Sequence, residues 1–178
     1  MLAQIGVPHS VRGAHIDETA HPGEAPRDYV MRMARQKALT VRESGEPLPV
    51  LAADTTVVLD DVIYGKPRDR ADGIGMLERL SGRTHEVLTA VAMADSRGIA
   101  MRLSESAVRF RTLTLEECAA YWETGEPHDK AGSYAVQGGA AVFIESLRGS
   151  YSGVMGLPLF ETAELLRAAG LGYWNGRN

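Results

Sequence analysis

The segment 51–69 gathers residue types that hydrolytic chemistry on phosphates uses. Asp54 opens an apolar run, two threonines follow it directly, and Lys66 comes one strand-turn-strand length later. Because 57–59 is apolar enough to be buried, Asp54 is carried into the fold, where a carboxylate needs a partner or has a function. A carboxylate can hold a divalent cation or accept a proton from water, and a lysine neutralises phosphate charge. A hydrogen-bonded strand-end Asp and a solvated turn Lys are an equally open interpretation.

The composition narrows the class of protein. With 178 residues, 44% hydrophobic and 24% charged, the chain can bury one substantial core, and we expect a single domain over 1–178. The formal charge of -4 disfavours duplex nucleic acid as a partner. Cys118 is the one cysteine and cannot form an internal disulfide, which fits a reducing cytoplasm. No apolar run approaches the roughly 18 residues of a membrane span, so we expect a soluble, unsecreted protein without membrane contact.

The hydrophobic periodicity alternates between helix and strand along the chain. It predicts helices over 26–41, 69–80, 114–124 and 158–169, and strands over 49–59, 62–64, 86–94 and 101–112. The Asp95 to Gly98 turn favours pairing of the last two strands. Interleaved helices and strands without an internal repeat indicate an α/β fold, a sheet with helical cover. The tail, 172–178, is expected to be frayed.

Five blocks of the sequence, in order, resemble the Maf family of nucleoside triphosphate pyrophosphatases. They are Ala53–Thr55, Gly65–Asp69, Leu80–Val87, Asp129–Tyr134 and Gly153–Leu159. The resemblance runs nearly end to end. It implies an elongated, strongly curved mixed sheet flanked by helices, with a central cleft between two lobes, as in inosine triphosphate pyrophosphatases. It also implies hydrolysis of a nucleoside triphosphate to the monophosphate and pyrophosphate with a divalent metal, Mg²⁺ or Mn²⁺.

The resemblance assigns roles to individual residues. Asp54 matches the carboxylate that orients or deprotonates water and contributes to the metal site, and Glu18 matches a second acid for the metal. Lys37 matches a helix lysine that contacts phosphate, and Lys66 would sit on the opposite cleft wall. Without the family, Glu18 is equally well an acidic loop residue, and Lys37 is a solvated helix lysine.

Two further residues concern the nucleobase. The amide of Gln137 can donate and accept together, as recognition of a pyrimidine edge requires. Gln137 and the segment around Arg83 resemble the branch of the family that acts on dTTP and UTP, and Arg83 is taken as a substrate-binding residue on that basis. His85 is interpreted as a surface histidine. Base choice depends on pocket contacts.

The sequence departs from the family at its start. Maf-like proteins open with a Ser-x-Ser-Pro-Arg-Arg loop after a first strand, and Met1–Val7 resembles the helix that continues from that loop. The loop would supply hydroxyls, guanidinium groups and amides to the triphosphate. Either the start was assigned at an internal Met, which we favour because the downstream blocks are intact, or the chain is a variant with weakened catalysis.

Two other functions compete with the hydrolase. One is a nucleotide-binding regulatory protein linked to cell division, with weak or no catalysis. The other is an aspartyl-phosphate hydrolase of the haloacid dehalogenase type, which needs a second Asp two residues after its nucleophile, where this chain has Thr56. A homodimer is the expected assembly, because symmetric dimers are common and the family has members that pair.

Overall fold

The computed structural model describes residues 1–174. The fraying that the sequence predicts for 172–178 therefore lies outside the described residues from 175 on. Within residues 1–174, five strands and five α-helices carry the fold, with short 3₁₀ segments between them. The strands are β1 (Val50–Leu59), β2 (Val62–Tyr64), β3 (Thr84–Asp95), β4 (Gly98–Phe110) and β5 (Ile144–Arg148). The α-helices are α1 (Pro26–Glu43), α2 (Arg70–Leu80), α3 (Leu115–Glu123), α4 (Tyr151–Val154) and α5 (Leu159–Ala168). The 3₁₀ segments are η1 (Leu2–Ile5), η2 (Glu126–Asp129), η3 (Ala131–Ser133) and η4 (Gly139–Phe143).

Local sequence signals explain where these elements begin and turn. Pro26 stands in the first turn of α1, where its missing N–H costs nothing. Thr114 and Glu117 form a capping box at the start of α3. Asp60 and Asp61 both have positive φ, which gives the two-residue turn joining β1 to β2 the twist that a tight hairpin needs.

The strands form one sheet in the order β2-β1-β3-β4-β5. All pairings are antiparallel, so the predicted mixed sheet is corrected to an antiparallel one, while the α/β class with flanking helices is confirmed. The turns of the two hairpins, β1–β2 and β3–β4, are too short for a parallel crossover, and the longer connections that carry α2 and α3 also return the next strand antiparallel to its neighbour in the sheet. Strand β5 and the 3₁₀ segments were not predicted from the sequence.

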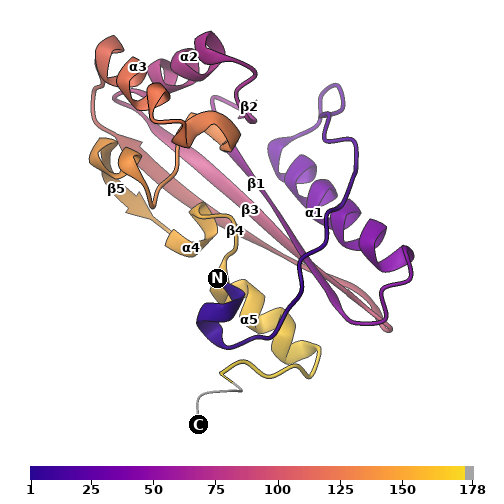
Figure 1. The fold of residues 1–178 in the computed structure, drawn as a ribbon. Coiled ribbons are helices and arrows are strands. Elements are labelled where there is room, and N and C mark those ends of the chain that lie inside the picture. The colour runs from indigo at the N-terminus through magenta and orange to yellow at the C-terminus, as the bar shows by residue number, and fades with distance from the viewer. Residues whose placement is uncertain (175–178) are drawn as a thin grey trace.

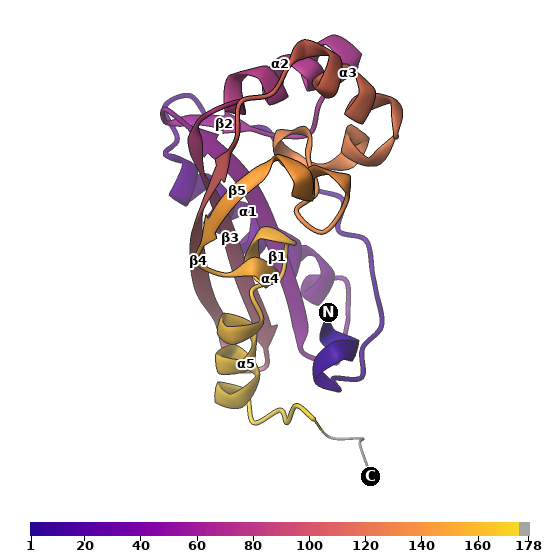
Figure 2. The same ribbon diagram turned by 90° about the vertical axis from the view of Figure 1, so that its left-hand side faces the viewer.

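Helices cover the two faces of the sheet differently (Figure 1). Helix α1 packs on one face through Val30, Ala34 and Ala38. On the other face α2 and α3 cover one end of the long strands, and α5 covers the other end together with the N-terminal segment. Figure 2 shows α4 and the chain before α5 lying between these two groups. The face opposite α1 is therefore covered by two separate groups of helices, one at each end of a continuous sheet.

The chain ends are tied to this arrangement. Ile5 and Val7 pack in the cluster that contains Leu165 and Leu166 of α5. The backbone N–H of Trp174 donates to the carbonyl of Ile5 at 2.7 Å, so the described part of the predicted frayed tail is anchored. Among residues 1–174, each helix is too short or too polar to cross a lipid bilayer.

Candidate functional site

A cleft opens beside the half of β1 that pairs on one side only. Strand β2 pairs with β1 only at Val57–Leu59, so within residues 1–174 the edge of 50–56 away from β3 has no strand partner. The cleft encloses about 280 Å³, and segments that are distant in sequence line it. Because successive side chains of a strand point to opposite faces, residues from both faces of β1 reach it.

Lys37 joins two acids at this cleft. From α1, its Nζ donates to Asp54 Oδ1 at 2.6 Å and lies 2.7 Å from Glu18 Oε1. The Asp54 side chain is only 11% exposed, whereas that of Glu18 is 45% exposed. Asp54 shares the α1-facing side of β1 with Val58, which is why a helix lysine reaches it. One ammonium between two carboxylates leaves a net negative charge at this point.

The electrostatics of this trio favour a proton acceptor. Burial, only partly offset by Lys37, raises the pKa of Asp54 above its ordinary value, and the neighbouring Glu18 charge acts in the same direction. The hydrogen bond from Lys37 lowers the pKa of Glu18. Burial works against the ammonium of Lys37, but its bonds to Asp54 and Glu18 outweigh burial and raise its pKa. Within the pair, the pKa of Asp54 is thus raised while that of Glu18 is lowered.

The facing wall adds two more cations. Lys66, in the loop after β2, and Lys130, before η3, both line the cleft. A backbone hydrogen bond from Gly132 N–H to the carbonyl of Gly65, at 3.1 Å, ties their two segments together. Lys130 also pairs with Asp129 at 2.8 Å. The sequence interpretation missed Lys130, although it lies inside one of the recognised blocks.

The remaining wall is mostly uncharged. Gln137 lines the cleft with an exposed side chain, near Val87, Tyr134 and Val154, which line it too. Thr89 on β3 donates to the carbonyl of Gly153 at 2.8 Å, which holds the segment 153–156 against the sheet. A charged region and a less polar region thus meet in one cavity, as a nucleotide requires.

The structure brings together five of the six predicted site residues. Glu18, Lys37, Asp54, Lys66 and Gln137 all line the cleft. Arg83 is not among the lining residues. Its guanidinium donates to Asp60 at 2.7 Å, because it stands directly before β3 at the end of the sheet where β1 turns into β2.

His85 is not on the surface, contrary to its interpretation from sequence. It is 1% exposed, and its Nε2 lies 2.8 Å from the hydroxyl of Tyr134. Burial lowers its pKa to about 4, so the ring is neutral at physiological pH. Its neighbours Phe110 and Tyr134 stack edge-on against it. Strand alternation was the signal available, since His85 faces the same side as Val87.

The acids of the cleft fit a hard divalent cation. Asp54 Oδ1 and Glu18 Oε1 both contact Lys37 Nζ, and each carboxylate keeps a second oxygen of the kind that Mg²⁺ and Mn²⁺ prefer as ligands. Within residues 1–174 no group of three or more His, Cys, Asp or Glu side chains is placed to hold a metal ion. Two carboxylates match a cation that completes its shell with substrate phosphates and water.

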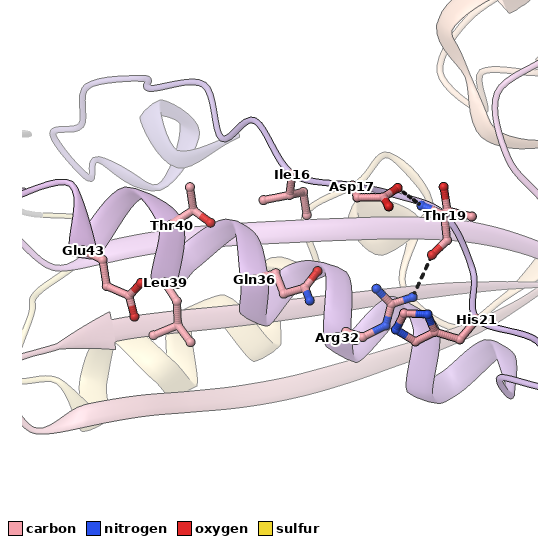
Figure 3. Close-up of a pocket in the computed structure, with 9 residues that line it drawn as sticks. All are labelled: Ile16, Asp17, Thr19, His21, Arg32, Gln36, Leu39, Thr40 and Glu43. Atoms are coloured by element: carbon pink, nitrogen blue, oxygen red, sulfur yellow. Dashed lines mark hydrogen bonds between the residues drawn. The ribbon is translucent and has the colours of Figure 1, made fainter.

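A second pocket, of about 430 Å³, lies beside α1 and the segment before it (Figure 3). It is larger than the cleft, but its arginine is occupied. Arg32 donates to Glu24 at 2.6 Å and to the carbonyl of Thr19 at 3.0 Å. Asp17 and Glu43 add negative charge to the lining. This pocket offers no free cation for a triphosphate.

Comparisons with known proteins bear on this cleft. Residues 1–169 match the family of Maf-like proteins. A Burkholderia thailandensis protein named dTTP/UTP pyrophosphatase is 53% identical, over 95% of this chain and 87% of the relative. A relative of the same name from Nitrosomonas europaea is 50% identical, over 96% of this chain and 89% of the relative. Another, from Alkalilimnicola ehrlichii, is 53% identical, over 93% of this chain and 85% of the relative.

Proposed function

Because this chain belongs to the Maf family, we propose that its cleft hydrolyses dTTP and UTP to the nucleoside monophosphate and pyrophosphate. Curated relatives at about 50% identity carry the name of this activity. The observation that carries the proposal is the contact of one ammonium, Lys37, with both Asp54 and Glu18 in a cavity that two further lysines line.

Asp54 is the proposed proton acceptor. Attack of water on a phosphorus atom needs a base that removes or orients the proton of the water. A base is stronger when its pKa is raised, and burial raises that of Asp54. The ionised carboxylate of Asp54 is the form that can accept this proton.

The lysines are the proposed phosphate contacts. Lys37 lies on α1 and Lys66 on the loop after β2, so the two cations approach the cleft from different segments. They neutralise the charge that develops on the departing pyrophosphate. Lys130 is a third candidate for this role. A Mg²⁺ or Mn²⁺ ion held by Asp54 and Glu18, when bound, supplies charge neutralisation at the phosphate oxygens.

Gln137 is the proposed contact for the base. Its amide can accept from the N3–H of uracil or thymine and donate to the neighbouring carbonyl. The less polar lining around it suits the faces of a pyrimidine ring. The phosphates and the base then occupy chemically different parts of one cavity.

The test compares two acids of the same region. We expect Asp54→Asn to lose at least about 100-fold in kcat for UTP with Mg²⁺ or Mn²⁺, while UTP still binds. Asp61→Asn is the matched control, because Asp61 is exposed in the β1–β2 turn and Asn tolerates its positive φ. The readouts are pyrophosphate release and UTP affinity on the same sample, which also separates a hydrolase from a regulatory nucleotide-binding protein. Full turnover by Asp54→Asn contradicts the proposal.

A further inference from the structure

The loop that carries Gln137 is held at both ends by one pair of side chains. On the near side, the Ala135 N–H donates to the hydroxyl of Tyr121 at 3.1 Å. On the far side, the Gly139 N–H donates to Glu126 Oε2 at 3.0 Å. The Tyr121 hydroxyl in turn donates to the other carboxylate oxygen, Glu126 Oε1. The two anchored amides lie two residues before and two residues after Gln137.

The anchoring pair is itself fixed. Tyr121 lies on α3, is 5% exposed, and packs edge-on against Phe143 at a ring distance of 5.3 Å. Glu126 begins η2 directly after the turn that ends α3. A methyl group on Gly138 would stand only 2.1 Å from Glu126 Oε2, so the loop backbone lies directly on the carboxylate.

Neither residue has a role in the proposed hydrolysis. Tyr121 and Glu126 do not line the cleft, whereas Ala135 and Gln137 do. The Gln137 amide makes no hydrogen bond to a side chain or backbone group within residues 1–174, so the position of its backbone decides where the amide can meet a ligand. A hydrogen-bonded hydroxyl and carboxylate that fix two backbone amides reduce the freedom of the segment between them.

We propose that Tyr121 and Glu126 are positioning residues that hold the Gln137 loop and thereby set the affinity of the cleft for a uracil or thymine base. This rests on the proposed function, in which Gln137 contacts the base. The phosphate contacts Lys37 and Lys66 come from other segments, and the third candidate, Lys130, lies outside the anchored stretch 135–139. The pair therefore acts on base binding and leaves phosphate binding unchanged.

The experiment separates base from phosphate. Tyr121→Phe keeps the ring against Phe143 and removes the hydroxyl. We expect the KM for UTP to rise about tenfold, equivalent to about 1.4 kcal/mol, with kcat within about twofold of wild type. Inorganic tripolyphosphate, which has no base, is expected to keep its competitive inhibition constant. Glu126→Gln is the second variant, and thermal melting checks that both are folded.

A double-mutant cycle with Gln137→Ala tests the route of the effect. If Tyr121 acts through Gln137, Tyr121→Phe adds almost nothing in the Gln137→Ala background. The inference is overturned if Tyr121→Phe weakens tripolyphosphate as much as UTP, if its effect adds fully to that of Gln137→Ala, or if folded Tyr121→Phe and Glu126→Gln both leave the KM unchanged. A wild-type protein that does not hydrolyse UTP contradicts the proposed function instead.

Discussion

Removal of the Lys37 ammonium should raise the pKa of Asp54. In Lys37→Met the carboxylate loses a hydrogen bond of 2.6 Å from a charged donor, and Glu18 remains nearby without the intervening ammonium. A hydrogen bond to a charged group contributes about 1.5–3 kcal/mol, and one pKa unit corresponds to about 1.4 kcal/mol. The pKa of Asp54, already raised by burial, should therefore rise by a further 1 to 2 units, approximately.

The assay is the pH dependence of kcat/KM for UTP. Because the base must be ionised, its acid limb follows the pKa of Asp54 in the free enzyme, and we expect this limb to move to higher pH by about 1 to 2 units in Lys37→Met. The maximum value of kcat/KM in this pH profile reports separately on the loss of the phosphate contact. The shift should persist in a Glu18→Gln background, which assigns it to Asp54.

Arg35→Met is the matched control for this experiment. Arg35 is an exposed cation on the same helix, so its removal lowers the general positive charge without touching Asp54. Its acid limb should stay within about 0.3 pH units of wild type, because exposed charges are screened by solvent and salt. An unmoved limb in Lys37→Met, or an equal shift in Arg35→Met, refutes the electrostatic reasoning.

Two further predictions concern stability. Since the folded-state pKa of Asp54 is raised above its ordinary value of 3.8, the stability that its neutral form contributes is present below the unfolded pKa and is lost as the pH rises through the folded pKa. The Tm of Asp54→Asn should therefore gain on that of wild type as the pH rises from the unfolded to the folded pKa of Asp54, and a difference that falls with pH contradicts this. Gly132→Ala should lower the free energy of unfolding in urea by about 1–3 kcal/mol more than Gly170→Ala does. The backbone φ is similar at the two positions, +69° and +72°, but a methyl group at Gly132 would stand 2.8 Å from Val57, whereas one at Gly170 meets nothing within 4 Å. Equal losses in the two variants would contradict this prediction.

The long elements could be predicted because their signals are local. The predicted helix over 26–41 corresponds to α1, and the predicted strand over 49–59 corresponds to β1, each within two residues at its ends. Strand β5 gave no such signal, because its five residues are mostly half-buried or exposed and its place depends on pairing with β4. Short edge strands are defined by tertiary contacts more than by their own pattern.

The candidate site was predictable where the family blocks carry it and not where three-dimensional packing decides. Asp54 and Lys66 follow from the sequence of one hairpin, but nothing local shows that Lys37 bridges Asp54 and Glu18. Arg83 lies inside a family block, but its side chain turns to Asp60, and its role in substrate binding stays a prediction. The single domain, the homodimer, the cytoplasmic location and the interpretation that the start was assigned at an internal Met stay predictions.

A crystal structure with a non-hydrolysable UTP analogue and Mg²⁺ would show directly whether the cleft binds the nucleotide. We expect the triphosphate in the cleft beside β1, within hydrogen-bond distance of Lys37 and Lys66, with the metal on Asp54 and the uracil edge at Gln137. A triphosphate bound in the pocket of Figure 3 would contradict the proposed function. So would a nucleotide bound far from Lys37 and Asp54 that leaves the contact between these two side chains unchanged.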